Sequence, residues 1–299
     1  MNQKELLREV RRTPVRFIPG KPAVSIFPGE WPSPFEGKGF EPRRFRDFAL
    51  GDNPRHIHIP TSARCGSPII IERVALRDVK LMVVLDLSPS MHVREKLDIQ
   101  FAAGALLLYS AWKSETTFGL AVRDGDNVAS FGLGIGSRHF YRLYGQLFRL
   151  LAASKERGRK RLGGKPVPLD QVLPANAILV YCSDFLQERG ELVELNELWK
   201  MVRRYDFVPV VVQDELEYSF PALLRGSFIS FENPETRRRE EIWISAERAR
   251  EIRTLHSERF ESLKRSLGRW GLRCIHLDSA NVQDVGKRID RFFRQRKRR

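Results

Sequence analysis

Cysteine is scarce in this sequence, and long apolar runs are absent from it. Only 3 cysteines occur among 299 residues, and they lie far apart, at Cys65, Cys182 and Cys274. Because this spacing provides neither a disulfide framework nor a CxxC zinc pair, we expect a protein of the reducing cytoplasm. The longest nearly continuous apolar stretch, residues 101–112, is well short of the roughly 20 residues of a membrane-spanning helix, so we expect no transmembrane segment. The charged opening, residues 1–12, is amphipathic and differs from a signal peptide.

The sequence also lacks the motifs of common nucleotide-binding and hydrolytic sites. The glycines of residues 132–136 are not followed by Gly-Lys-Ser/Thr, so we interpret this run as the end of a strand. No G-x-S-x-G motif is present, and no histidine is positioned by the sequence to activate Ser183. We therefore expect a protein without enzymatic activity. A metal-dependent phosphodiesterase or similar hydrolase is the enzymatic alternative, and it would need a base that the sequence does not supply.

Positive charge is concentrated at the two ends of the chain. The net charge is +15, of which residues 1–80 contribute +6, residues 81–220 contribute zero and residues 221–299 contribute +9. The basic residues are densest in the last segment, residues 284–299. A basic tail of this kind can contact nucleic-acid phosphates, lipid headgroups or an acidic protein, and its charge does not identify which.

Apolar patterning alternates between strands and helices over most of the chain. The continuous apolar run at residues 79–85 is typical of a strand buried on both faces of a parallel sheet. Residues 117–122 and 127–131 flank a turn-forming Asp-Gly-Asp and predict a hairpin. This alternation predicts an α/β fold with a doubly wound, mostly parallel sheet. Further strands are expected at 177–182, 207–212 and 272–277, and helices at 94–114, 138–153, 190–204, 246–268 and 282–295.

We expect the chain to have two parts. Residues 1–78 form an N-terminal region, with a helix at 2–12 followed by a β-rich segment. Residues 79–299 form the α/β domain, with a hairpin inserted at about 216–245. We further expect strands from residues 40–75 to pack with this hairpin as a small additional β-rich subdomain, because neither segment has another apolar surface to bury against.

Acidic and hydroxyl side chains follow two of the expected buried strands. Asp86, Ser88 and Ser90 form a D-x-S-x-S run directly after the first strand, and Asp184 follows a later one. In an open α/β sheet, ligands bind beyond the carboxyl ends of the strands, near the switch in strand order. Carboxylate and hydroxyl oxygens form a hard donor set suited to Mg²⁺ or Mn²⁺. We therefore predict a metal site made by these four residues, with the ion open to a partner's carboxylate as its last ligand.

Electrostatics favours a cation among these residues. Two ionised carboxylates about 6 Å apart repel by roughly 2–3 kcal/mol at an effective dielectric constant of about 20. A divalent ion or a raised pKa would relieve this repulsion. Helix capping is the simpler alternative, because a serine after a strand commonly begins a helix, and Ser90 could cap the helix expected near residue 94.

The sequence resembles a known family in these motifs and in several others. Asp86-x-Ser88-x-Ser90 with a later Asp184 looks like the metal-ion-dependent adhesion site (MIDAS) of von Willebrand factor A domains. More specifically, the chain resembles the bacterial family named domain of unknown function 58 (DUF58), and residues 4–12 resemble the opening of its short soluble branch. The stretches that carry this resemblance are Phe35-Glu36-Gly37-Lys38-Gly39, Arg46-Asp47-Phe48, Gly51-Asp52-Asn53-Pro54-Arg55, Ser62-Ala63-Arg64-Cys65-Gly66, residues 86–91 and residues 179–185.

The resemblance implies a von Willebrand factor A-like module with an additional N-terminal region. Proteins of this family are associated with a MoxR-type AAA+ ATPase in the chaperone-like assembly or activation of other complexes, and no enzymatic reaction is established for them. The resemblance also implies that Asp86, Ser88, Ser90 and Asp184 hold Mg²⁺ or Mn²⁺. The implied partners are such an ATPase and a client protein.

The sequence departs from the family pattern at one expected metal ligand. The adhesion site normally takes a third hydroxyl, from a threonine, in the loop before the strand at 177–182. Residues 163–169 contain no Thr or Ser, and Val167 lies where the threonine is expected. A water would have to replace the missing ligand, or Asp170 would substitute for it.

The basic segments support an alternative function. Residues 287–299 and the basic loop at 155–165 could bind nucleic acid or another anionic surface, and peripheral membrane contact is compatible with such a surface. This alternative predicts affinity that falls steeply with salt concentration and that is lost when residues 287–299 are deleted. We favour the non-enzymatic, metal-dependent protein-interaction module.

Overall fold

The structure, a computed structural model, describes residues 2–13, 15, 28–36, 42–49, 57–77, 80–124, 127–155, 169–175, 177–185, 195–214, 226–232 and 239–296. The chain divides into two compact units. One unit comprises Met1–Gly20 together with Lys80–Arg299, and the other comprises Lys21–Val79. The two units are described separately here.

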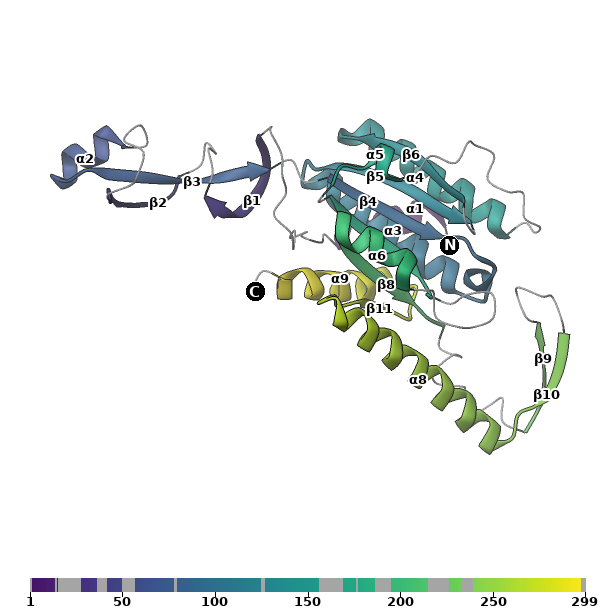
Figure 1. The fold of residues 1–299 in the computed structure, drawn as a ribbon. Helices are drawn as coiled ribbons and strands as arrows, with labels where there is room; N and C mark the ends of the chain where they lie inside the picture. Colours follow the sequence, from purple (N-terminus) through teal and green to yellow (C-terminus); the bar gives the residue numbers. More distant parts are fainter. Residues whose placement is uncertain are drawn as a thin grey trace. The chain divides into compact units, whose positions relative to one another are not determined.

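The larger unit contains a six-stranded, mostly parallel sheet (Figure 1). The strand order is β11-β8-β7-β4-β5-β6, in which every neighbouring pair is parallel except the antiparallel pair of β5 and β6. The structure thus confirms the expected α/β architecture with a mostly parallel sheet. The strands are β4 (Lys80–Asp86), β5 (Thr117–Asp124), β6 (Asn127–Gly134), β7 (Ile178–Ser183), β8 (Asp206–Val212) and β11 (Ile275–Leu277).

The direction in which strands are added to this sheet switches at β4. After β4 the chain adds β5 and β6 on one side, and then β7, β8 and β11 on the other. Open α/β sheets bind ligands beyond the carboxyl ends of their strands at such a switch point. In this sheet the switch point lies between β4 and β7.

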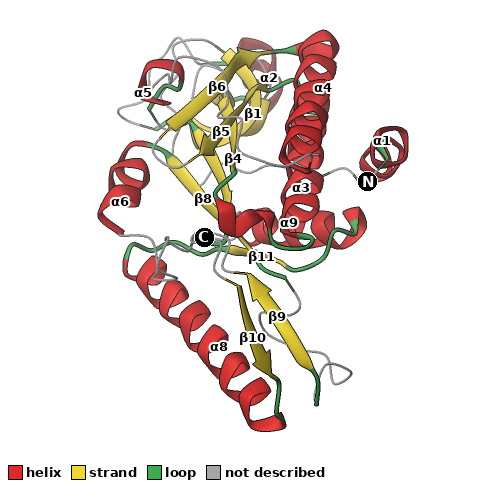
Figure 2. Ribbon diagram, turned by 90° about the vertical axis from the view of Figure 1, so that its right-hand side faces the viewer, coloured by secondary structure: helices red, strands yellow, loops and turns green. Residues whose placement is uncertain are grey.

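Helices cover both faces of the sheet (Figure 2). Two sets of helices do so, with α3, α4 and α9 on one face and α6 and α8 on the other. The helices confirm the sequence prediction, with ends that move by a few residues. Their bounds are α3 (Lys96–Lys113), α4 (Gly136–Lys155), α6 (Leu195–Arg204), α8 (Ala246–Arg269) and α9 (Val282–Arg296).

The residues of β4 explain why both faces are covered. Alternate side chains of a strand point to opposite faces, and Leu81 to Leu85 are all buried. Leu85 lies against α3, where a Cβ built on Gly104 would be 3.5 Å from Leu85 Cδ2. Met82 and Val84 instead pack in a cluster with Leu263 of α8. An apolar run without alternation therefore corresponds to a central strand between two helical layers.

Helix α3 is buried around most of its circumference. Its residues from Ile99 to Ala111 are all buried, because the sheet, α4 and α9 surround the helix. Among the described residues, no helix is both long and apolar enough to cross a membrane.

The first helix, α1 (Gln3–Arg12), belongs to the larger unit. Its buried residues Leu6 and Val10 lie one turn apart, and it packs against α3 and α9. Tyr144 of α4 donates a hydrogen bond of 2.7 Å from its hydroxyl to the Gln3 carbonyl. The expected region 1–78 is thus divided, because its helix clusters with the residues that follow Lys80.

The smaller unit contains a three-stranded antiparallel sheet in the order β1-β3-β2. The strands are β1 (Pro28–Glu36), β2 (Pro42–Asp47) and β3 (Ile69–Arg77). A short helix, α2 (Ile59–Cys65), was not expected from the sequence, and Gly66 ends it in the left-handed conformation at φ 70°.

A separate hairpin precedes α8 in the larger unit. It pairs β9 (Phe228–Glu232) with β10 (Arg239–Trp243) as a two-stranded antiparallel sheet. The expected packing of this hairpin with strands from residues 40–75 stays a prediction, because the two segments belong to different units.

Candidate functional site

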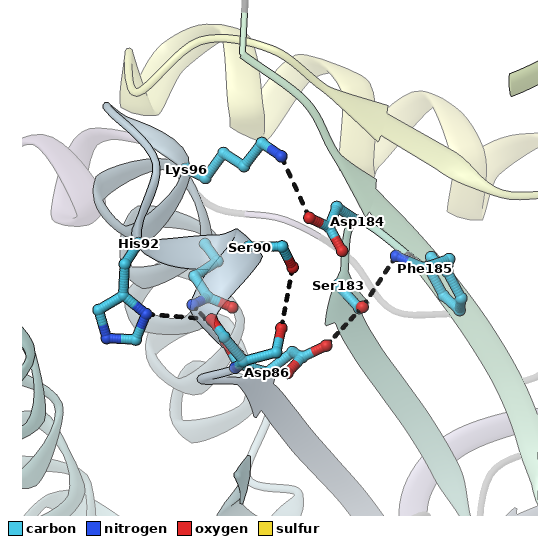
Figure 3. A network of polar contacts seen from close by, with 9 residues as sticks. Asp86, Ser90, His92, Lys96, Ser183, Asp184 and Phe185 are labelled. Carbon is cyan, nitrogen blue, oxygen red and sulfur yellow. Dashed lines mark hydrogen bonds and ion pairs between the residues drawn. The ribbon is translucent and has the colours of Figure 1, made fainter. Parts of the chain in front are cut away.

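Asp86 and Asp184 lie at the ends of neighbouring parallel strands. Asp86 is the last residue of β4, Asp184 directly follows β7, and Leu85 pairs with Cys182 in the register of these strands. Parallel strands end at the same edge of a sheet, which we name the carboxyl edge. Figure 3 shows both aspartates with Ser90 at this edge. The structure therefore brings the predicted residues together, at the switch point of the sheet.

The side chain of Asp86 is held on both oxygens. The backbone N–H of Ser88 donates to Oδ1 at 2.9 Å, and the hydroxyl of Ser183 donates to Oδ2 at 2.6 Å. Gln100 of α3 donates from Nε2 to the Asp86 carbonyl at 2.7 Å. Asp86 is only 6% exposed, so these contacts fix its orientation in a nearly dry environment.

Burial raises the pKa of the Asp86 carboxyl, and the negative charge of Asp184 raises it further. The hydrogen bonds from Ser183 and Ser88 act in the opposite direction, because they favour the charged form. Burial also raises the pKa of Tyr181, and the charges of Asp86 and Asp184 add to that effect. The site therefore disfavours further negative charge, as expected where a cation is needed.

Ser88 directly precedes a short 3₁₀ helix, η2 (Pro89–His92), and Ser90 lies within it. Their hydroxyl oxygens are 3.1 Å apart, and Nδ1 of His92 lies 3.0 Å from the Ser88 carbonyl oxygen. The capping alternative for Ser90 is wrong, because the N-cap of α3 is Glu95, which makes no side-chain capping bond. The serine hydroxyls are thus not used in beginning that helix.

Ser183 connects the two strand ends. Its hydroxyl donates to Asp86 and accepts a hydrogen bond of 2.9 Å from the backbone N–H of Phe185. Phe185 has a positive φ of 56°, and its ring is fully buried. A non-glycine residue in this region costs about 1 kcal/mol or more, which burial of the ring offsets. The loop that carries Asp184 is therefore anchored on either side of the aspartate.

Lys96 is a residue of the site that the sequence analysis missed. It is the first residue of α3, and its Nζ lies 3.1 Å from Oδ2 of Asp184 (Figure 3). The two side chains are only 2% and 1% exposed, so this ion pair is buried. One signal was available in the sequence, because a lysine at a helix N-terminus opposes the helix dipole and calls for a nearby anion.

Aspartates also follow the parallel strands β8 and β11 at this edge. Asp214 lies beyond β8 and pairs with Arg94 at 3.1 Å between Oδ1 and Nε, and Asp278 follows β11 and pairs with Arg288. With the pair of Lys96 and Asp184, three of the four aspartates that end or follow β4, β7, β8 and β11 have a cationic partner. Asp86 is the exception, because no lysine or arginine among the described residues forms an ion pair with it.

The residues present fit a hard divalent ion in the chemistry of their donors. Asp86, Asp184 and the hydroxyls of Ser88 and Ser90 supply only oxygen, as Mg²⁺ and Mn²⁺ prefer. In the described part of the chain, no group of three or more His, Cys, Asp or Glu side chains could hold a metal, so any site here depends on the serines. The loop with Val167 and the side chain of Asp170 lie outside the described residues.

The basic C-terminal helix is largely neutralised by its own contacts. In α9, Lys287 lies 3.8 Å from Asp284, Arg294 lies 2.5 Å from Asp290, and Arg296 pairs with Asp206. These pairs reduce the positive charge that α9 offers to a polyanion. Residues 297–299 and most of the loop at 155–165 lie outside the described residues, so binding of nucleic acid through them stays a prediction.

Comparison with known sequences identifies a family and no function. The family model described as "Protein of unknown function DUF58" matches residues 44–261. No curated protein matches this sequence.

Solved structures are similar to the chain only distantly. An aerotolerance-related membrane protein from Bacteroides fragilis NCTC 9343, with multiple mutations to serines, has 12% identity and a TM-score of 0.37; the match covers 73% of this chain and 99% of that one. The pilus adhesin SpaC from Lactobacillus rhamnosus GG has 10% identity and a TM-score of 0.32, over 74% of this chain and 30% of that one. A mutant of the PilB minor pilin from Streptococcus sanguinis has 13% identity and a TM-score of 0.29, over 77% and 64%. At these TM-scores the similarities carry no argument about function.

Proposed function

We propose a function for this chain on the premise that it belongs to DUF58, the protein family of unknown function whose model matches residues 44–261. The larger unit is a von Willebrand factor A-like, non-enzymatic module that binds other proteins through a divalent metal ion. Asp86, Ser88, Ser90 and Asp184 hold Mg²⁺ or Mn²⁺ at the carboxyl edge, and a carboxylate from the partner completes the coordination.

The observation that carries this proposal is the unpaired charge of Asp86. Asp184, Asp214 and Asp278 at the same edge each have a lysine or arginine partner, whereas Asp86 has none among the described residues. A nearly buried carboxylate next to a second carboxylate is costly unless a cation or a proton neutralises it. A divalent ion beside Asp86 would supply that charge.

The chain's own residues would prepare the site for such an ion. Ser183 and the backbone of Ser88 orient the Asp86 carboxylate before any ligand arrives. Ser88 and Ser90 present two hydroxyls from one turn, so both can turn their oxygens toward the same ion. When bound, a divalent ion supplies an electron-poor position that a partner's aspartate or glutamate can occupy.

The proposed partners are a MoxR-type AAA+ ATPase and a client protein, in the chaperone-like assembly or activation of a complex. Family resemblance alone supports this part of the proposal. It is tested by isolating the protein from its native host in the presence of Mg²⁺ or of a chelator. We expect recovery of an AAA+ ATPase with Mg²⁺ and its loss with the chelator. Equal recovery under both conditions contradicts the metal dependence.

The metal site is tested by titrating Mn²⁺ and Mg²⁺ while the thermal unfolding of the protein is followed. We expect the ions to raise the Tm of the wild type and to leave the Tm of Asp86→Ala unchanged. Asp214→Ala is the matched control, because it removes another buried aspartate of the carboxyl edge and should preserve the response. No shift for the wild type, or an equal shift for Asp86→Ala, contradicts the site.

A further inference from the structure

Lys96 is unusual in both its place and its burial. As the first residue of α3, it places a positive charge at the positive end of the helix dipole. Its side chain is nevertheless 2% exposed, although a lysine can normally extend to solvent. The ion pair with Asp184 offsets both costs, since Nζ lies 3.1 Å from Oδ2 of that residue. The ion pair with Asp184 therefore stabilises the ammonium in this buried position.

Lys96 also acts electrostatically on a histidine of a neighbouring helix. Burial lowers the pKa of His256 on α8 to about 4, and the charges of Arg259 and Lys96 contribute to this. A divalent ion bound by Asp184 would add two further charges close to the ammonium. The carboxylate of Asp184 cannot neutralise both cations, so the two compete for it.

Lys96 directly follows exposed residues in the sequence. The two preceding residues, Arg94 and Glu95, are exposed, and the lysine side chain has four flexible methylene groups. A change of rotamers of this side chain, without movement of the sheet, is the motion that departure from Asp184 requires. In this respect it differs from the ligands that β4 and β7 hold rigidly.

We propose that Lys96 is a built-in competitor of the divalent ion, and that metal binding displaces its ammonium from Asp184. This inference rests on the proposed metal site. With Lys96 in place, Asp184 is neutralised and the carboxyl edge is stable without metal. With metal bound, Lys96 turns outward and presents its charge at the surface next to the ion. Metal occupancy thereby changes the surface that a partner meets, and the metal affinity is set below that of an uncompensated site.

The test compares Mn²⁺ binding by the full-length wild type and by Lys96→Met, with free Mn²⁺ counted by electron paramagnetic resonance. We expect Lys96→Met to bind Mn²⁺ about tenfold more tightly or more, in the usual range for two coupled ligands. Lys96→Arg keeps the competing charge and should show no gain. Arg296→Met is the matched control, because it breaks the ion pair of another buried aspartate, Asp206, at the opposite edge of the same sheet and should bind like the wild type.

The outcomes separate this inference from the proposed function. If the wild type binds Mn²⁺ and Lys96→Met binds no more tightly, the competition is wrong while the metal site stands. If neither protein binds Mn²⁺, both the metal site and the competition are wrong.

A second measurement needs no variant and therefore does not depend on the folding of Lys96→Met. The buried amine of Lys96 should react slowly with an acylating reagent, and saturating Mn²⁺ should increase its rate of labelling several-fold, as read by mass spectrometry. Lys264, which is partly exposed, provides the internal reference for reagent strength. Unchanged protection of Lys96 at saturating Mn²⁺ overturns the proposal.

Discussion

The two edges of the large sheet each contain a buried ion pair, and the two pairs are built differently. At the carboxyl edge, Nζ of Lys96 lies 3.1 Å from Oδ2 of Asp184. At the opposite edge, Arg296 of α9 binds both oxygens of Asp206 at the start of β8, at 2.6 and 3.2 Å. The guanidinium also stacks over Phe292, with its Cζ 5.3 Å from the ring centroid.

The difference indicates two roles for the same kind of chemistry. A bidentate arginine is fixed by its planar geometry and by stacking, and it joins α9 to β8 permanently. A lysine is a point charge on a flexible stem, and it can be exchanged for another cation. We therefore expect the amino edge to contribute mainly to stability, and the proposal assigns ligand exchange to the carboxyl edge.

The largest expected effect is that of Lys96→Met in metal-free buffer. Removing the ammonium takes away the ion pair of the buried Asp184 carboxylate, so we expect a loss of about 3–5 kcal/mol in the free energy of unfolding, measured by urea denaturation. Adding Asp184→Asn should restore part of the loss, because the buried charge is then gone. A loss that the second substitution does not reduce would show that packing of the lysine stem is responsible.

Arg296→Met should cost somewhat less, about 3 kcal/mol in the same assay, because its side chain is 18% exposed and water can partly solvate Asp206. The difference between the two edges is tested further by measuring the stability of both variants with and without Mn²⁺. The ion should stabilise Arg296→Met by as much as it stabilises the wild type, and it should stabilise Lys96→Met by more. Equal responses would contradict the distinction between an exchangeable pair and a permanent one.

Ser183→Ala should cost about 2 kcal/mol near neutral pH, because a hydrogen bond to a charged carboxylate is lost. The same bond lowers the pKa of Asp86, so the variant should have an even higher pKa at this residue. An acid with a raised pKa in the folded state destabilises the fold as the pH rises through that pKa. The deficit of Ser183→Ala should therefore be smallest in acid and grow toward neutral pH, as measured by urea denaturation at several pH values. A deficit independent of pH would mean that Asp86 does not titrate in this range.

The smallest effect on stability is expected for Ser90→Ala. It loses one hydroxyl contact with Ser88, worth about 0.5–1 kcal/mol. The same substitution should weaken Mn²⁺ binding about tenfold, because it removes one of the proposed oxygen ligands. If the affinity is unchanged while the stability falls, Ser90 only supports the turn.

Much of the larger unit could be predicted from its apolar pattern. Helices cover both faces of β4, so residues 79–85 are apolar without alternation. A short stretch of sequence is enough to show this pattern. The placement of Asp86 and Asp184 at one edge followed from the parallel order of their strands. The short elements α2 and η2 were missed because runs of four to seven residues carry little periodicity.

The partners of the charged residues could not be predicted. Lys96 and Asp184 are 88 residues apart, and Arg94 meets an aspartate beyond β8. In the sequence, a cation at the start of a helix indicates that an anion is nearby, but it does not indicate which one. In the fold Lys96 is buried against Asp184, and it is therefore part of the candidate site.

By itself, the sequence determined which segments form strands and helices and which oxygen donors follow the strands, because periodicity and strand ends are properties of short stretches of chain. Only the tertiary structure decided which carboxylates are neutralised. Charge compensation depends on distances of a few ångströms between residues that the fold alone brings together. That is why Asp184 has an ammonium beside it, whereas Asp86, one strand away, has none from the part of the chain that the structure describes.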